Sequence, residues 1–256
     1  MNLGLAGKGC VVTGASSGIG RATARMLSEE GASVLLVGRR EEALREVGPH
    51  WLAFDITEPD AGERIVSECE QRFGSLDVLV NNAGTSAIKT LEELSEEDWD
   101  EQWKLNVLGP MRLMRAAAPR MAERGWGRIV NVSSSSAKRP SGTNLAYSVA
   151  KAAELSLSRG FADQYASKGV RVNAVTPGGV ESELWMAEGG MADQLAKLRG
   201  TTREQALEER RNAVPVREWA TPEEIASVIV FLCSENASYV TGAAWSVDGG
   251  VVQVII

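Results

Sequence analysis

Seven short runs of apolar, mostly β-branched residues recur along the chain, and helical patterns separate them. The runs lie at residues 9–14, 32–38, 51–54, 77–82, 128–134, 170–175 and 243–247. Most of them are continuously apolar rather than alternating, which predicts strands that are buried on both faces. Because strands and helices alternate without a break in composition, we predict an α/β fold, a doubly wound parallel sheet with helices on both faces. No linker or repeat interrupts the pattern, so we expect one domain over residues 1–256.

One connection breaks this rhythm. No strand pattern occurs between Pro177 and Ala220, where two helical stretches lie near 188–198 and 202–213. A long insertion after the carboxyl end of a strand is typical of a lid over a ligand site. We therefore predict a lid-like segment at about 178–220, called the excursion below; the alternative is a small extra helical layer on the surface. Its expected apolar underside consists of Leu184, Trp185, Met186, Met191 and Leu195.

Composition narrows the possible functions. Hydrophobic residues make up 44% of the 256 residues, which excludes a disordered chain, and the net charge of −7 argues against nucleic acid or an anionic membrane as partner. The chain contains neither an apolar run long enough for a bilayer nor the pattern of a secretory signal. Three scattered cysteines without a C-x-x-C motif predict a reducing, cytoplasmic location. The single histidine, His50, cannot form a three-ligand zinc site, so we expect no metal.

The first strand leads into a glycine-rich turn, TGASSGIG at 13–20, and a helical pattern follows. Glycines there let the backbone approach a pyrophosphate, which the helix N-terminus stabilises. The second strand ends at Gly38, and Arg39 and Arg40 follow where an acidic residue would bind a ribose 2′-hydroxyl. An arginine there suits a 2′-phosphate and favours NADP(H), with NAD(H) possible. The alternative is that both arginines begin an exposed helix.

Tyr147 and Lys151 are four residues apart in a helical, alanine-rich stretch, which puts both side chains on one helix face. A phenol has a pKa near ~10 and is a weak base at neutral pH, but a nearby ammonium favours its ionised form. The pair alone is also compatible with an ordinary surface helix. Ser134 and the segment 81–84 end two strands at the edge where open parallel sheets bind ligands, which makes the pair a candidate site.

Pro110 lies four residues after Asn106 and has no N–H, so the carbonyl of Asn106 loses its normal helical donor. We predict a kink at this point, with a carbonyl available to hold a water; the alternative is a plain proline kink. The same helical segment carries an apolar stripe that we expect to face the core, at Trp99, Trp103, Val107, Met114 and Ala118.

Together these motifs resemble the short-chain dehydrogenase/reductase family over essentially the whole chain. They are TGASSGIG at 13–20, Asp55 after the third strand, NNAG at 81–84, Asn106 in KLNVLG, Ser134 in NVSSSS, YSVAK at 147–151, Pro177-Gly178 and DGG at 248–250. The resemblance implies a seven-stranded parallel Rossmann sheet and hydride transfer between nicotinamide C4 and a carbonyl or secondary alcohol. It also implies a homotetramer that packs the helices carrying Asn106 and Tyr147.

The resemblance further implies residue roles. Tyr147 is the general acid/base and Ser134 hydrogen-bonds the substrate oxygen. Lys151 favours the phenolate and binds the nicotinamide ribose, while Asn106 holds a water that links Lys151 to solvent. Ser182 stands where the family often has threonine and keeps the hydroxyl. With Arg39, the expected cofactor-binding residues are Gly14, Ser16, Ser17, Gly18, Ile19, Asp55, Ile56, Asn82, Ala83, Gly84, Tyr147, Lys151, Pro177, Gly178, Val180 and Ser182.

The sequence therefore predicts an NADP(H)-dependent ketoreductase that interconverts a small-molecule ketone and a secondary alcohol. A 3-oxoacyl-thioester reductase is one option, and Lys138 and Arg139 near the active-site edge would favour an acidic carrier. The alternatives are an NAD(H)-dependent alcohol dehydrogenase acting on a small cyclic or terpenoid alcohol, and a non-catalytic dinucleotide-binding sensor. The apolar tail at 251–256 is expected to be buried at a subunit contact.

Overall fold

The computed structural model describes residues 2–253 and contains a seven-stranded parallel sheet in the order β3-β2-β1-β4-β5-β6-β7. The predicted doubly wound α/β fold is confirmed. Strand order reverses between β1 and β4, and ligands bind in open α/β sheets at such a point. The strands are β1 (Gly9–Thr13), β2 (Ser33–Gly38), β3 (Trp51–Ala53), β4 (Val78–Asn81), β5 (Gly127–Val132), β6 (Val170–Pro177) and β7 (Ala244–Val247).

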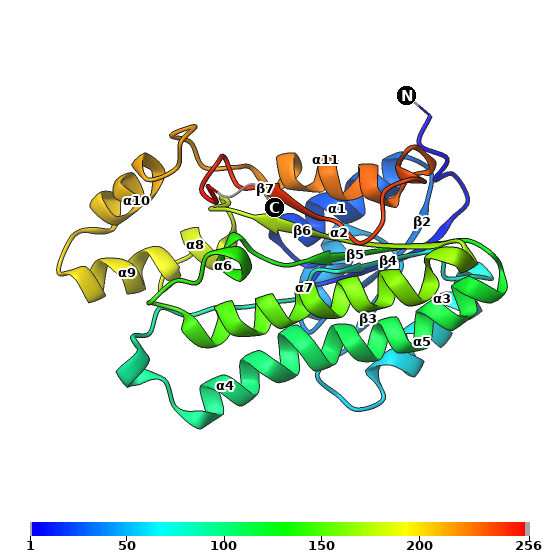
Figure 1. Ribbon diagram of the computed structural model, residues 1–256, viewed down its shortest axis with the longest axis horizontal. Helices are drawn as coiled ribbons and strands as arrows, with labels where there is room; N and C mark the ends of the chain where they lie inside the picture. Colours follow the sequence, from blue (N-terminus) through cyan, green and yellow to red (C-terminus); the bar gives the residue numbers. More distant parts are fainter. Residues whose placement is uncertain (1, 254–256) are drawn as a thin grey trace.

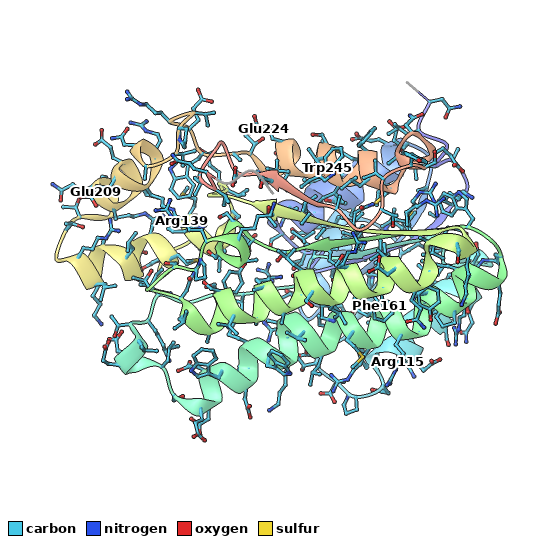
Figure 2. All side chains as sticks on the ribbon, in the orientation of Figure 1. Arg115, Arg139, Phe161, Glu209, Glu224 and Trp245 are labelled. Carbon is cyan, nitrogen blue, oxygen red and sulfur yellow. The ribbon has the colours of Figure 1, made fainter. Side chains whose placement is uncertain are left out.

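Helices cover both faces of the sheet (Figure 1). They are α1 (Gly18–Glu29), α2 (Glu41–Val47), α3 (Ala61–Phe73), α4 (Glu96–Trp103), α5 (Gly109–Glu123), α6 (Ser135–Lys138), α7 (Leu145–Tyr165), α8 (Glu183–Met186), α9 (Met191–Arg199), α10 (Arg203–Asn212) and α11 (Pro222–Cys233). Figure 2 shows Arg115 on α5 and Phe161 on α7 on the same side of the sheet, where these two helices contact each other. No helix within residues 2–253 has the length and apolarity needed to cross a bilayer.

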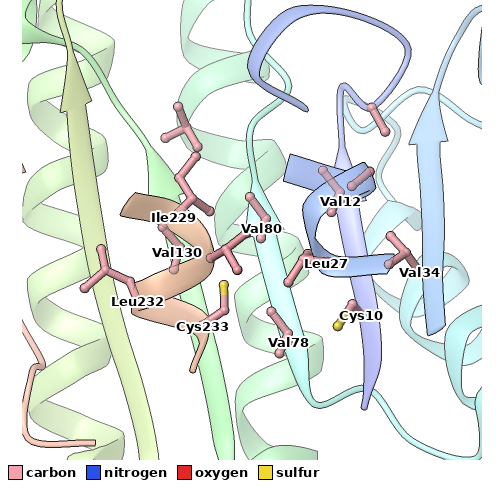
Figure 3. Packing of buried hydrophobic residues seen from close by; sticks show 14 of the residues in the cluster. Cys10, Val12, Leu27, Val34, Val78, Val80, Val130, Ile229, Leu232 and Cys233 are labelled. Atoms are coloured by element: carbon pink, nitrogen blue, oxygen red, sulfur yellow. The ribbon is translucent and has the colours of Figure 1, made fainter. Parts of the chain in front are cut away.

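The strands are buried on both faces, as their continuous apolar runs predict. Because successive strand residues point to opposite faces, Val12 joins the cluster under α1 and α11, whereas Val11 joins the one under α3, α5 and α7. Figure 3 shows the first cluster, in which Leu27 of α1 and Ile229 of α11 lie over Val12, Val80 and neighbouring strand residues. Each fully buried valine or leucine contributes about 1.5–3 kcal/mol.

A π-helical turn, Lys104–Leu108, separates α4 from α5 at the position where the sequence predicts a kink. There the N–H of Gly109 donates to the carbonyl of Lys104, five residues back. Such a turn contains one residue more than an α-helical turn and therefore shifts the phase of the helix. The predicted apolar stripe is consequently wrong at its start: Trp103 is 44% exposed, although Met114 and Ala118 are fully buried.

The excursion contains α8, α9 and α10 and extends beyond the carboxyl end of β6, at the left of Figure 1. Its buried cluster consists of Trp185, Met191, Ala192, Leu195, Ala196 and Ala206. The rings of Trp185 and Trp219 meet edge to face, with centroids 5.1 Å apart. Leu184 is 38% exposed and lies outside this cluster, but it lines the cavity beneath the excursion, as do Trp185 and Met191 of the predicted apolar underside.

The C-terminal tail is described only in part. Val251 and Val252 are half-buried, and residues 254–256 lie outside the described residues. The predicted burial of this tail at a subunit contact therefore stays a prediction.

Candidate active site

A cavity of about 810 Å³ runs along the carboxyl ends of the strands, between the sheet and the excursion. Its size is that of a pocket for a large organic ligand. Of the predicted site residues, Asn106 alone does not line it. Those that do are Gly14, Ser16, Ser17, Gly18, Ile19, Arg39, Asp55, Ile56, Asn82, Ala83, Gly84, Ser134, Tyr147, Lys151, Pro177, Gly178, Val180 and Ser182.

The glycine turn after β1 packs directly against the end of β4. Gly14 has φ +65°, and a Cβ on it would lie 2.9 Å from the Cα of Ala83 and from Nδ2 of Asn82. The Asn82 amide in turn donates to the carbonyl of Thr13 at 2.9 Å. These contacts hold the turn in one conformation, which only glycine adopts without strain at this position.

The N-terminus of α1, which follows this turn, suits an anion. Its N-cap Ser17 makes no side-chain capping hydrogen bond, and the first turn contains no acidic residue. The first N–H groups of a helix have no intrahelical acceptor, and the helix dipole adds partial positive charge there. The cavity therefore contains a phosphate-binding position that the protein itself leaves uncapped.

A cluster of two arginines and one carboxylate lies beside this turn. Nη2 of Arg40 donates to Oγ of Ser16 at 3.2 Å and to Oε2 of Glu183 at 2.9 Å. Nη2 of Arg21 donates to the Ser16 carbonyl at 2.7 Å and lies 3.5 Å from Oε1 of Glu183. Sequence reasoning chose Arg39 for this role, and Arg39 also lines the cavity, but Arg40 is the arginine that reaches Ser16. The sequence also offered Arg40, because it directly follows Arg39 after the end of β2.

At the β3 end of the cavity, Asp55 caps the turn that follows β3. Its Oδ1 accepts hydrogen bonds from the N–H and hydroxyl of Thr57, at 2.9 and 2.8 Å. Ile56, which follows, is buried and packs in the cluster under α5. The apolar side chain of Ile56 and the polar backbone of the turn therefore lie at the same rim of the cavity.

The middle of the cavity is lined by Ser134, Tyr147 and Lys151. Ser134 follows β5 and caps α6, where its Oγ accepts from the N–H of Ser136 at 3.1 Å. Tyr147 and Lys151 lie one turn apart in α7, and the Lys151 ammonium is 5.9 Å from the centre of the Tyr147 ring. A phenol, a hydroxyl and an ammonium thus face one space, which suits proton transfer to or from an oxygen there.

Lys151 is only 2% exposed and is held by two acceptors. Its Nζ donates to the carbonyl of Val132 at 2.8 Å and to Oε2 of Glu154 at 3.0 Å. Glu154 is 1% exposed, and burial raises the pKa of its carboxyl while the neighbouring ammonium lowers it. Sequence reasoning missed Glu154, although its position three residues after Lys151 on one helix face was a usable signal.

Asn106 is fully buried in the π-helical turn. Its Nδ2 donates to Oε1 of Gln102 at 2.8 Å, but its Oδ1 has no hydrogen-bond partner. A Cβ built on Gly84 would lie 3.2 Å from this oxygen and 3.7 Å from Nζ of Lys151, so both side chains approach the same point. An unpaired buried acceptor costs about 1–3 kcal/mol, and a water molecule at that point would remove the cost.

The two basic residues expected at the active-site edge differ in their contacts. The ammonium of Lys138 donates to the carbonyl of Ala244 at 2.7 Å and to Oγ of Ser246 at 3.0 Å, and so ties α6 to β7. Arg139 is exposed (Figure 2). Lys138 is thus engaged with β7 rather than presented to an acidic carrier.

These residues fit a dinucleotide that carries a 2′-phosphate. The cavity is large enough, the uncapped α1 N-terminus suits a pyrophosphate, and Arg40 with Ser16 forms a second anion position. The unpartnered Oδ1 of Asn106 and Nζ of Lys151 both lie beside Gly84, at the edge of this cavity.

Known proteins with similar sequences and structures are mainly oxidoreductases. The model of the family described as enoyl-(acyl carrier protein) reductase matches residues 14–252. A 3-oxoacyl-[acyl-carrier-protein] reductase of Thermotoga maritima is 36% identical over 97% of this chain and 99% of its own length. A cis-4-hydroxycyclohexanecarboxylate dehydrogenase of Sinomonas cyclohexanicum is 39% identical over 95% and 96%. The crystal structure of L-sorbose reductase from Gluconobacter frateurii, complexed with NADPH and L-sorbose, matches with a TM-score of 0.92 at 35% identity over 100% of both chains.

Proposed function

Because the chain belongs to the short-chain dehydrogenase/reductase family, we propose that it interconverts a ketone and a secondary alcohol with NADP(H), using Tyr147 as general acid/base. The observation that carries this proposal is one cavity lined by Ser134, Tyr147 and Lys151 together with the glycine turn. A preference for NADP(H) is supported by the hydrogen bond between Arg40 and Ser16. It is also supported by the NADPH bound to the similar L-sorbose reductase.

Five parts of the cavity would hold the cofactor. Residues 14–19 would bind the pyrophosphate, Arg40 with Ser16 the 2′-phosphate, and residues 55–56 the adenine. The nicotinamide would lie against residues 177–182, and residues 82–84 would form the floor of the cavity on the adenosine side. When bound, the nicotinamide supplies or accepts a hydride at its C4 atom.

The proton moves through Tyr147. During reduction the phenol donates its proton to the carbonyl oxygen that becomes the alcohol, and during oxidation the phenolate takes it back. Ser134 would assist this transfer. Its Oγ accepts a hydrogen bond from the N–H of Ser136, but its own hydroxyl hydrogen has no acceptor among residues 2–253. That hydrogen is therefore available to the substrate oxygen, which orients the carbonyl toward the phenol.

Lys151 and Asn106 would help to return a proton to the phenol of Tyr147. The bonds of the Lys151 ammonium to Val132 and Glu154 hold it beside the Tyr147 ring, where its charge would stabilise the negative charge that proton transfer leaves on the phenol oxygen. An ammonium has three N–H groups, so one remains for the cofactor ribose. A water on Oδ1 of Asn106 would lie close to Lys151 and carry protons onward.

The proposal is tested by mixing the purified protein with NADPH or NADH and a panel of linear, cyclic and polyhydroxylated ketones. We expect NADPH absorbance to fall with at least one ketone, and kcat/KM to be at least tenfold higher with NADPH than with NADH. A protein that binds NADPH but oxidises it with no member of the panel would be a sensor, which contradicts the proposal. An equal or higher kcat/KM with NADH would contradict the cofactor assignment.

We also propose a homotetramer. Trp103 of α4 is 44% exposed and Val149 of α7 is 41% exposed, and these two helices pack against each other. Such apolar side chains on adjacent helices suit burial against another subunit. Light scattering should give a mass of four chains, and a monomer would contradict this arrangement.

A cytoplasmic location is proposed from the cysteines. Cys10, Cys69 and Cys233 are all buried and unbonded to one another, and burial raises the pKa of Cys69 and Cys233 to about 12. Such thiols are structural and suit a reducing compartment. Cell fractionation should find the protein with cytoplasmic markers, and recovery from an oxidising compartment would contradict this.

A further inference from the structure

One arginine of the excursion faces the cavity without an anionic partner. Arg210 of α10 lines the same cavity as Tyr147, and its guanidinium carbon is 5.4 Å from the centre of the Trp185 ring. Among residues 2–253, no carboxylate lies within ion-pair distance of Arg210. The other three arginines of α9 and α10 each have one, in the pairs Arg199–Glu209, Arg203–Asp193 and Arg211–Glu208.

The surroundings of Arg210 make this unpaired charge costly. The side chain is withdrawn from water, and this burial lowers the pKa of its guanidinium, with the charge of Arg199 acting in the same direction. A partly buried charge without a counter-ion is unfavourable, whereas an anion from the ligand would offset the loss of water. Three carboxylates also line the cavity, those of Asp55, Glu101 and Glu183, and none of them lies within ion-pair distance of Arg210; Asp55 and Glu183 are engaged with other residues.

A second polar group of the same cavity also lacks a partner. Ser86 is 7% exposed, and its buried Oγ has no hydrogen bond. The segment that carries it is held against the excursion, because the N–H of Ile88 donates to Oε1 of Gln194 at 2.9 Å. Ile88 also packs on the cluster that contains Trp185. Ser86 lies two residues after Gly84, the residue beside which Oδ1 of Asn106 and Nζ of Lys151 lie.

We propose that the substrate is an oxo acid, or the corresponding hydroxy acid, whose carboxylate binds Arg210. This rests on the ketone–alcohol reaction proposed above. The planar guanidinium matches a planar carboxylate with two parallel hydrogen bonds. The body of the substrate lies along Trp185 and Met191, with Ser86 as a further hydrogen-bonding group. Since the chain as a whole carries a net charge of −7, attraction of an acid depends on this local cation.

The test measures binding, separately from turnover. The protein saturated with NADP⁺ is titrated by calorimetry with three acid–amide pairs of different size: butyrate and butyramide, cyclohexanecarboxylate and its carboxamide, gluconate and gluconamide. At least one acid should bind tenfold or more tightly than its amide. Arg210→Gln should abolish that preference, and the matched control Arg211→Gln should keep it, because Arg211 pairs with Glu208 and does not line the cavity.

Two outcomes overturn the proposal: no acid preferred over its amide in the wild type, or the same preference in Arg210→Gln. Thermal unfolding of Arg210→Gln establishes that the variant is folded. The result is distinguishable from failure of the proposed reaction. An acid preference without NADPH oxidation of any ketone or oxo acid would refute the reaction alone. Oxidation with neutral ketones and no acid preference would refute the carboxylate site alone.

Discussion

The sheet edge and the excursion are built differently, although they line one cavity. At the sheet edge, Lys151 is almost fully buried and held by two acceptors, and Gly14 is packed against the end of β4. In the excursion, short helices surround a cluster of six buried residues, and Arg210 and Glu183 reach the cavity from its surface. The groups that we propose to move protons are therefore fixed by the core, whereas the groups that we propose to contact the ligand are side chains at the surface of the excursion. Variants of the first kind should therefore reduce turnover, and variants of the second kind should change binding.

The largest effect is expected for Lys151→Met, at the sheet edge. Without the ammonium, the negative charge that proton transfer leaves on the phenol oxygen loses its nearby counter-charge, and turnover with NADPH should fall about 10²–10⁴-fold. The variant also leaves Glu154 as an unpaired buried carboxyl, which costs about 3–5 kcal/mol of stability. The double variant Lys151→Met/Glu154→Gln separates the two effects, because it should recover the unfolding temperature but not the turnover. Full turnover in either variant would contradict the role of Lys151.

The second effect distinguishes two adjacent arginines. Arg40→Ala removes the side chain that reaches Ser16 and should weaken NADPH binding about 10–100-fold, as expected for one charged hydrogen-bonding group, with NADH binding unchanged. Arg39→Ala is the matched control and should change NADPH binding much less. Titration of the intrinsic fluorescence measures both. A larger loss in Arg39→Ala would return the 2′-phosphate to the residue chosen from the sequence.

A smaller effect is expected from a variant in the excursion, and it is a gain in NADPH affinity rather than a loss. Glu183 forms an ion pair with Arg40, the arginine that would bind the 2′-phosphate. Its carboxylate would therefore compete with NADPH for this arginine. Exposed ion pairs contribute about 0.2–1 kcal/mol, and Glu183→Gln should therefore tighten NADPH binding about 2–5-fold. NADH, which has no 2′-phosphate, should bind as before. Weaker NADPH binding in this variant would mean that Glu183 supports the site instead of competing for it.

The smallest effect concerns stability and pH. Burial raises the pKa of Glu154 in the folded protein above its unfolded value of 4.5. The stability contributed by this carboxyl is therefore fully present below pH 4.5 and is lost as the pH rises through the raised folded value. The unfolding temperature of Glu154→Gln should rise relative to wild type as the pH increases, by about 2–4 °C for each kcal/mol. Glu123→Gln, at an exposed position of α5, should show no such trend, and a falling difference would contradict the sign.

Local patterns in the sequence predict the secondary structure of this protein well. The apolar runs predict all seven strands, because buried parallel strands need continuous apolar residues. Pro110 predicts the disturbance around Asn106, because the missing N–H is a local property. The expected burial of Trp103 was wrong because the π-helical turn shifts the phase of the helix between Trp103 and the residues that follow the turn.

Contacts between distant segments were not predictable in this way. Arg40 and Glu183 are 143 residues apart in the chain, and nothing in either local sequence indicates that they meet. The same holds for Arg210, whose lack of a partner becomes visible only when α9 and α10 are packed. Glu154 is intermediate, since its spacing from Lys151 was visible but its burial was not.

The most direct measurement is a single turnover with Tyr147→Phe, which keeps the ring and removes the hydroxyl. The variant is loaded with NADPH and mixed rapidly with the best ketone of the panel. The control is Tyr165→Phe, on the same helix but stacked on Phe161 in the core. We expect Tyr147→Phe to bind NADPH normally and oxidise it at least ~10²-fold more slowly than wild type, and the control to react like wild type. Oxidation by Tyr147→Phe at the wild-type rate would contradict proton transfer through this phenol.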